Sequence, residues 1–287
     1  MSDHYKIGFA NLNEANEYAL KVRQSLEACA AQDHEVELVV RDNALDDDKA
    51  LANAAEFAEN HVDLVIMYHI NERLSGKIRS ILKTTPLIAV DIPIPFTIYV
   101  GIDNVQMGQM AAEALRDWIH QHGGTVDKLL GVIDSRVVGS VRERVNQVEN
   151  RLLEEAILIQ GNSLFVDASF TPERNYDVLY QALKNWADFE RIAIVGYNDQ
   201  TTLDALQVVE DLNMAGQVAV VGHAASDLVI EKMNDTSSLI ACTLSYPEKY
   251  GAVLYDVARR MLDHERVPAK NHVPLGLLQS SVNHASG

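Results

Sequence analysis

The sequence predicts an α/β protein of two lobes, each built on a parallel sheet with helices on both faces. Strand-length apolar runs alternate with helical patterns along all 287 residues, and strictly alternating strand and helix units form parallel sheets. The alternation breaks at residues 92–100, where two prolines and an apolar run follow a strand with no helix between them. A closed barrel needs eight even units. We therefore interpret the break as a crossing of the chain between lobes and expect further crossings at 240–247 and 275–282.

Each element of the first half is predicted from a local pattern. Short apolar runs predict strands, and apolar residues that recur every three or four positions predict helices. In the first helix Ala19, Val22, Leu26 and Cys29 fall on one side. The predicted order is strand 5–12, helix 15–32, strand 35–41, helix 46–60, strand 62–68, helix 72–83 and strand 86–91.

The second half continues the alternation after the run at 92–100. The segment Gly101-Ile-Asp-Asn104 opens a helix that extends to residue 120. Strands are then predicted at 129–134, 163–168, 191–197, 218–222, 240–247 and 275–282, separated by helices at 140–157, 172–186, 201–212, 228–234 and 248–263.

The composition is that of a globular protein, with 47 % apolar and 23 % charged residues. A formal net charge of −17 disfavours binding to nucleic acid or to an anionic membrane surface. No segment reaches the roughly 18 consecutive apolar residues of a membrane helix, and MSDHYKIGFA enters a strand without the apolar core of a signal peptide. We expect either a cytoplasmic protein or a chain whose leader was removed, with Cys29 and Cys242 as buried free thiols.

The motifs of the common enzyme classes are absent from the sequence. It contains no GxSxG elbow, HExxH pair, CxxC pair, GxxxxGK[ST] loop or GxGxxG turn. Its ten histidines are dispersed rather than spaced as metal ligands. The sequence therefore predicts a protein that is not an enzyme and that uses neither a cofactor nor a metal.

Polar side chains follow the predicted strands, at the edge where parallel sheets bind ligands. Carboxylates and amides bond to pairs of hydroxyls, arginine donates a fork of N–H groups, and aromatic rings cover an apolar sugar face, so this set suits a polyol. The residues are Asn13, Glu14, Asn16, Glu17, Tyr68, His69, Asp91, Asp103 and Asn104 in the first half, and Asp134, Ser135, Arg136, Phe170, Asn198, Asp199, His223, Ser245 and Tyr246 in the second.

These residues also have plainer structural interpretations. Asn104 and Asp199 are candidate helix N-caps, and the cluster at 13–17 is a candidate for a solvated helix start favoured by the helix dipole. His69 and His223, taken singly, are better explained as structural or loop residues. Arg142 and Arg144 lie two positions apart on one predicted helix and point to different sides, so one of them must face inward or along the lobe.

Several segments resemble the type 1 periplasmic binding proteins and the homologous effector domains of LacI-type repressors. The most specific are VGIDNVQMGQMAAEAL and IAIVGYNDQTTLDALQVV; KIGFANLNEANEYAL, PLIAVDIP, RERVNQVENRLLE and LSYPEKYGAVLYDVA extend the similarity over nearly the whole chain. The resemblance implies two Rossmann-like lobes, residues 1–104 with 246–274 and residues 105–245 with 275–287. It also implies three hinge crossings and a ligand cleft that closes between the lobes.

The resemblance further implies which residues contact the ligand. They are Glu14, Asn16 and Glu17 of the first loop, Tyr68 of a polar loop, the strand-end Asp91, the ligand-clamping Arg144, the ring-stacking Phe170, Asn198 and the hinge residue Ser245. His69 and His223 join this set as strand-end residues. Ile92 and Ala224 lie where sugar binders often have Arg and Asp, and Ser245 where Gln is common. These departures argue against plain ribose or galactose, and the charges of Glu14 and Glu17 suit a cationic or unusually hydroxylated ligand.

The resemblance leaves three functions open. The first hypothesis is the extracytoplasmic, monomeric solute-binding protein of an ABC importer, which binds a carbohydrate-like molecule and docks on a membrane permease. The second is the dimeric, cytoplasmic effector domain of a LacI-type regulator without its DNA-binding headpiece, and the third is a ligand sensor domain. The net charge, and HGGTVDKLLG in place of the Gly-His-basic stretch common in repressors, favour the first.

Overall fold

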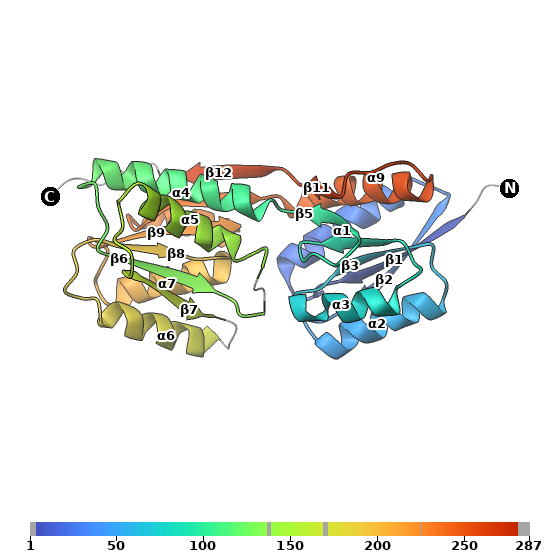
Figure 1. Cartoon of the computed structure of the whole chain (residues 1–287), viewed down its shortest axis with the longest axis horizontal. Helices are drawn as coiled ribbons and strands as arrows, with labels where there is room; N and C mark the ends of the chain where they lie inside the picture. The colour runs from blue at the N-terminus through green and yellow to red at the C-terminus, as the bar shows by residue number, and fades with distance from the viewer. Residues whose placement is uncertain (1–3, 137–138, 169–171, 225, 281–287) are drawn as a thin grey trace. The chain divides into compact units, whose positions relative to one another are not determined.

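The computed structural model describes residues 4–136, 139–168, 172–224 and 226–280, and the chain divides into two compact units. Unit 1 comprises Met1–Asp103 and Tyr246–Pro274, and unit 2 comprises Asn104–Ser245 and Leu275–Gly287. The chain therefore passes between the units three times. Each unit holds a six-stranded sheet flanked by helices (Figure 1), which confirms the predicted α/β class.

Unit 1 has a fully parallel sheet in the order β11-β5-β4-β3-β1-β2. Helices α1 and α9 pack together on one face, and α2 and α3 on the other (Figure 1). The strands are β1 (Tyr5–Asn11), β2 (Val36–Asp42), β3 (Leu64–Tyr68), β4 (Leu87–Val90), β5 (Ile98–Gly101) and β11 (Lys270–His272). The helices are α1 (Glu17–Ala30), α2 (Asp47–Glu59), α3 (Ser75–Ile81) and α9 (Tyr250–Leu262), with short 3₁₀ helices η1 (Glu72–Leu74) and η2 (Pro247–Lys249).

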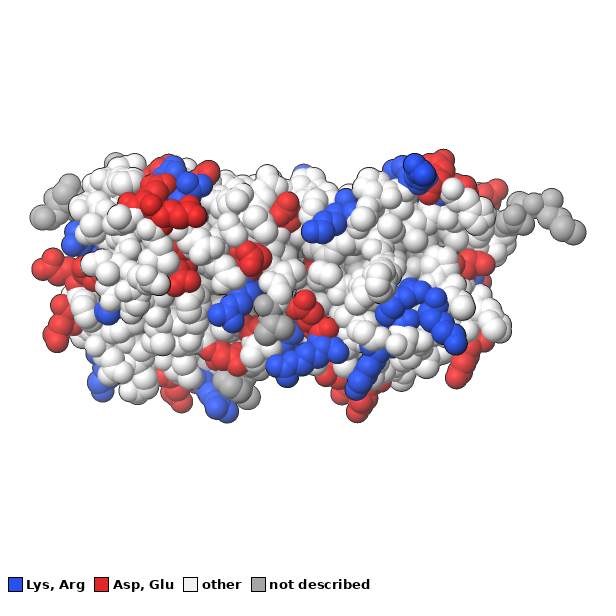
Figure 2. All heavy atoms as spheres, in the orientation of Figure 1, with Lys and Arg blue, Asp and Glu red and all other residues white. Residues whose placement is uncertain are grey.

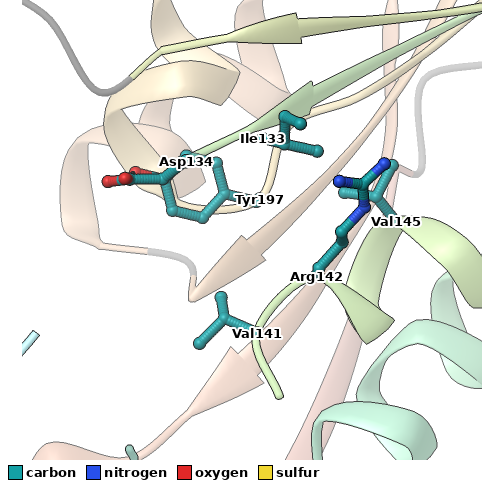
Figure 3. Close-up of a pocket in the computed structure, with 6 residues that line it drawn as sticks. All are labelled: Ile133, Asp134, Val141, Arg142, Val145 and Tyr197. Atoms are coloured by element: carbon teal, nitrogen blue, oxygen red, sulfur yellow. Dashed lines mark hydrogen bonds between the residues drawn. The ribbon is translucent and has the colours of Figure 1, made fainter. Parts of the chain in front are cut away.

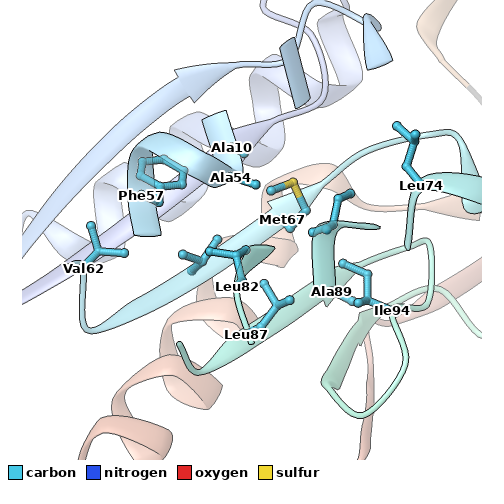
Figure 4. Packing of buried hydrophobic residues seen from close by; sticks show 12 residues of the cluster. Ala10, Ala54, Phe57, Val62, Met67, Leu74, Leu82, Leu87, Ala89 and Ile94 are labelled. Carbon is cyan, nitrogen blue, oxygen red and sulfur yellow. The ribbon is translucent and has the colours of Figure 1, made fainter. Parts of the chain in front are cut away.

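The core of unit 1 explains why its central strands are continuous apolar runs. On one face of β3, Val65 and Met67 belong to the same buried apolar cluster as Phe57 of α2. Figure 4 shows Met67 and Phe57 within this cluster. Leu64 and Ile66 are also fully buried, and successive side chains of a strand point to opposite faces. Both faces of the sheet are therefore covered by helices, as in other parallel sheets.

Unit 2 repeats this plan with the order β12-β10-β9-β8-β6-β7, in which β12 alone runs antiparallel. The strands are β6 (Lys128–Ile133), β7 (Ser163–Asp167), β8 (Ile192–Val195), β9 (Val218–Ala224), β10 (Leu239–Ser245) and β12 (Leu275–Gln279). The helices are α4 (Asn104–Gln121), α5 (Glu143–Glu154), α6 (Pro172–Lys184), α7 (Asp199–Asp211) and α8 (Asp227–Asp235). Figure 1 shows α4 and α5 on one face of this sheet and α6 and α7 on the other.

Two glycines permit close packing between helices. A Cβ atom on Gly108 of α4 would lie 2.7 Å from the carbonyl oxygen of Glu143. A Cβ atom on Gly251 of α9 would overlap the main chain of Ser25 on α1, and the Gly251 N–H donates to Ser25 Oγ at 3.0 Å. Each unit therefore depends on one glycine where its paired helices meet.

The prediction that residues 92–100 cross between lobes is wrong. β5 lies beside β4 in the sheet of unit 1, with Val90 opposite Val100, and the chain leaves this unit only after Asp103. The connection turns at Asp91 and Phe96, whose φ angles are 58° and 59°. It joins two parallel neighbouring strands without the helix that usually links them. The missing helix is why the spacing of the elements led to a wrong prediction.

Smaller differences concern single elements. The strand β11 was not predicted, because its sequence Lys-Asn-His has no apolar residue. Cys242 is buried as expected, but Cys29 is only partly buried. Within the described part of the chain, no helix combines the length and hydropathy required to cross a membrane.

Candidate functional site

Each sheet has a topological switch point, where the strand order reverses and where open parallel sheets bind ligands. In unit 1 this point lies between β1 and β3, which end on Asn11 and Tyr68. In unit 2 it lies between β6 and β8, which Asp134 and Tyr197 follow. All four residues are buried. The carboxyl edge of each sheet is therefore a candidate site.

Glu14, in the loop after β1, is already paired within unit 1. Its carboxylate accepts hydrogen bonds from Asn11 Nδ2 and from Arg23 Nε, each at 2.8 Å. Arg23 also donates to Glu27 at 2.6 Å. Arg23 is shared between Glu14 and Glu27, so it offsets only part of the negative charge that the sequence suggested for a cationic ligand.

Asn16 and Glu17 take part in the start of α1. The Asn16 side chain caps the helix by accepting from the Ala19 N–H at 2.9 Å. Glu17 pairs with Lys21 one turn later, at 2.7 Å, on the exposed side of the helix. Both side chains have structural partners, and their predicted contact with a ligand stays a prediction.

His69 follows β3 and is buried with one ring nitrogen unpaired. Its Nε2 lies 3.2 Å from Ser75 Oγ, and Nδ1 has no hydrogen-bond partner among the described residues. Burial lowers the pKa of His69 to about 4, so the ring is neutral near pH 7. The neighbouring Tyr68 carbonyl accepts from Asn43 Nδ2 at 2.9 Å.

Asp91 connects two segments of unit 1 that lie next to passages between the units. Its Oδ1 accepts from the Ile102 N–H at 3.3 Å and from the Tyr250 hydroxyl at 2.7 Å. The Tyr18 hydroxyl in turn lies 3.3 Å from that of Tyr250. Burial, and then the charge of Asp91, raise the pKa of Tyr250 well above its usual value. This carboxylate therefore has a structural role in addition to its predicted contact with a ligand.

The switch point of unit 2 borders a shallow surface depression. Asp134 accepts from the Tyr197 hydroxyl at 3.1 Å and from Arg136 Nη2 at 2.6 Å. Burial, and then Asp134, raise the pKa of Tyr197. Figure 3 shows the lining residues, which are Ile133, Asp134, Val141, Arg142, Val145 and Tyr197.

Arg144 faces inward from α5, which confirms that one of the two neighbouring arginines does so. It is 8 % exposed. Its Nε donates to Asn104 Oδ1 at 2.6 Å, and its Nη1 donates to the Tyr197 carbonyl at 2.9 Å. Arg142 instead lies over the ring of Phe165, 5.4 Å from its centroid.

His223 and Ser245 lie on β9 and β10, at the same edge of unit 2, and both are buried. His223 Nδ1 is 2.6 Å from Thr243 Oγ1. Neither His223 Nε2 nor Ser245 Oγ has a partner among the described residues. Burial, and then the charge of Arg144, lower the pKa of His223 well below its usual range, so its ring is neutral.

Helix caps differ from two of the sequence expectations. Asn198, not Asp199, caps α7, in a reciprocal capping box with Thr201, and Asp199 accepts from the Ser226 N–H at 2.8 Å. Asn104 is the first residue of α4, and its side chain binds Arg144. Phe170 lies outside the described residues.

Sequence reasoning missed a pair of aspartates at the ends of the edge strands β2 and β7. Asp42 accepts from the Glu14 N–H at 3.2 Å, and Asp167 accepts from the Ser135 N–H at 3.1 Å. Each therefore holds the loop that follows the neighbouring strand. The signal was available, because both strands end on Asp.

In the described part of the chain, the charged groups do not form a metal site. Among the described residues no three His, Cys, Asp or Glu side chains gather as metal ligands. On the face drawn in Figure 2, acidic and basic side chains are interspersed. The edges described above therefore offer mainly hydrogen-bonding groups.

Comparison with known proteins gives one family and one fold. The family model described as periplasmic binding protein domain matches residues 7–266. No curated protein sequence matches the chain.

Solved structures share the fold at low sequence identity. An ABC transporter solute-binding protein from Bacillus halodurans C-125 with bound myo-inositol has a TM-score of 0.82 and 17 % identity, over 98 % of this chain and 96 % of that one. One from Mycobacterium smegmatis with bound glycerol has a TM-score of 0.83 and 18 % identity, over 96 % and 94 %. One from Actinobacillus succinogenes 130z with bound D-allose has a TM-score of 0.78 and 18 % identity, over 96 % and 98 %.

Proposed function

The chain belongs to the periplasmic binding protein domain family, and from this premise we propose that it is the solute-binding protein of an ABC importer. Its ligand is a sugar or a sugar-like small molecule. The protein binds and releases this ligand without chemical change.

One observation carries the proposal, namely the buried hydrogen-bonding atoms that lack a partner at the carboxyl edge of each sheet. These atoms are Asn11 Oδ1 and His69 Nδ1 in unit 1, and His223 Nε2 and Ser245 Oγ in unit 2. An unsatisfied buried polar atom costs about 1–3 kcal/mol, and ligand hydroxyls supply the missing partners. The set contains neutral donors and acceptors, which suits a polyhydroxylated molecule.

Thermal shift and titration calorimetry on the full chain test the proposal with myo-inositol, D-allose, D-ribose and glycerol. A ligand at a hundred times its dissociation constant stabilises the native state by about 2.7 kcal/mol, which is measurable. His223→Leu should weaken binding at least tenfold. His120→Leu, the same change at a half-exposed histidine, should not. Failure of every sugar, polyol and sugar acid to raise the melting temperature argues against the proposal.

The proposed partner is an ABC permease, and the proposed location is outside the cytoplasmic membrane. The family supports both, since its solved relatives include ABC transporter solute-binding proteins. Cell fractionation tests the location. If the native protein is instead a longer chain with a DNA-binding segment, and if it is recovered with the nucleoid, the regulator hypothesis is favoured.

A further inference from the structure

Arg144 is a buried cation whose charge is not balanced by a carboxylate. Its two hydrogen-bond partners are the Asn104 amide oxygen and the Tyr197 carbonyl, both neutral. Within the described residues, no Asp or Glu oxygen lies within 4.0 Å of its guanidinium. Burial of a charge without a counter-charge is costly, so this arrangement requires an explanation.

Two other arginines near the carboxyl edges of the sheets have carboxylate partners. Arg23 binds Glu14 and Glu27, and Arg136 binds the buried Asp134. Both are more exposed than Arg144, with side chains 22 % and 39 % accessible. Arg23 and Arg136 are therefore balanced by carboxylates, whereas the more deeply buried Arg144 is not.

Two hydrogen-bonding groups without a partner lie on neighbouring strands at the edge where Arg144 binds the Tyr197 carbonyl. His223 on β9 is close enough to Arg144 to feel its charge, and Ser245 ends the adjacent strand β10. His223 Nε2 and Ser245 Oγ have no partner among the described residues. When His223 Nδ1 accepts from the Thr243 hydroxyl, Nε2 carries the proton and donates. Arg144 also lies in the first turn of α5 and binds the first residue of α4, so two helix N-termini add positive potential there.

Resting on the proposed function, we propose that the ligand is an anionic sugar derivative whose carboxylate or phosphate binds Arg144, with His223 and Ser245 as further donors. A charged acceptor supplies the missing counter-charge and satisfies the unpaired donors together. The acids of the same edge do not compete, because Asp134 is held by Arg136 and Tyr197. The net charge of −17 repels anions only weakly beyond the Debye length of about 8 Å at physiological salt.

Titration calorimetry with matched pairs tests this inference on the full chain. The pairs are D-glucuronate and D-glucose, D-galacturonate and D-galactose, and glucose 6-phosphate and D-glucose, so that carboxylate and phosphate are distinguished. We expect at least one acid to bind ten times more tightly than its neutral parent. Arg144→Gln should abolish this preference, whereas Arg151→Gln, on the same helix but paired with Glu155 at the surface, should retain it.

The outcomes separate the two proposals. Neutral parents that bind as tightly as their acids overturn the anionic ligand and leave the sugar-binding function standing. An acid preference that survives Arg144→Gln overturns the assignment to Arg144, and a panel in which nothing binds overturns both proposals. If Arg144→Gln loses its cooperative melting transition, Arg144→Lys replaces it, and this variant should keep the acid preference at reduced affinity.

Discussion

Replacement of Asp91 tests whether its carboxylate holds unit 1 together. Asp91→Ala removes the acceptor of the Ile102 N–H and of the Tyr250 hydroxyl. Hydrogen bonds to charged groups contribute about 1.5–3 kcal/mol each. The lower end applies here because Tyr250 keeps the Tyr18 hydroxyl as a partner and Asp91 is partly exposed.

These terms give the expected size of the effect. Loss of both bonds at the lower end costs about 3 kcal/mol. An alanine at the left-handed backbone of residue 91, where φ is 58°, adds about 1 kcal/mol, for a total of about 4 kcal/mol. Asp91→Asn keeps an acceptor oxygen and tolerates this backbone, so its cost should be about 1 kcal/mol.

Urea unfolding of the full chain measures the difference. Circular dichroism reports both units, whereas Trp118 and Trp186, the two tryptophans of the sequence, both lie in unit 2. Asp91→Ala should therefore shift the circular dichroism transition more than the fluorescence transition. Equal costs for Ala and Asn, or equal shifts by both probes, would refute the structural role of the carboxylate.

Two further predictions concern helix packing and pH. Gly251→Ala should destabilise unit 1 by about 2 kcal/mol, since overpacked sites cost about 1–3 kcal/mol. The control Gly76→Ala, at a position with open space around it, should be neutral or stabilising. Equal melting temperatures of the two variants would contradict this prediction. His69 has a pKa of about 4 when folded and near 6.5 when unfolded. The unfolded chain therefore binds more protons between these values, and stability should fall by about 3 kcal/mol as pH drops from 6.5 to 4. His69→Gln should flatten this profile in urea titrations, and an unchanged slope would show that the ring does not titrate as described.

The fold could be predicted from sequence wherever both faces of a strand are buried. The apolar run Leu64–Tyr68 is an example, because a strand covered by helices on both sides must be continuously apolar. The prediction failed where the pairing of a strand in the sheet is not reflected in the apolar pattern of its sequence. β11 pairs through its backbone with β5 although its side chains are polar, and β5 follows β4 after a loop that looks like a break in the alternation.

The candidate site was predictable in residue types but not in pairing. Glu17 and Lys21 are four residues apart on a helix, so their contact could have been inferred. Glu14 and Arg23 are nine apart, and Arg144 and Asn104 are 40 apart. Their contacts depend on how helices meet strands and each other. The sequence therefore indicated a charged first loop and a clamping arginine. The structure shows Glu14 of that loop paired with Arg23, and Arg144 without a counter-charge.

The division of unit 1 between two distant parts of the chain has a consequence for protein synthesis. Residues Tyr246–Pro274 supply α9 and β11 to this unit, yet they leave the ribosome after nearly all of unit 2. Until then, the side of α1 that packs on Gly251 and the β5 edge that pairs with β11 have no cover. Nascent chains shorter than about 270 residues therefore expose an incomplete sheet edge, which is a site for aggregation and for chaperone binding.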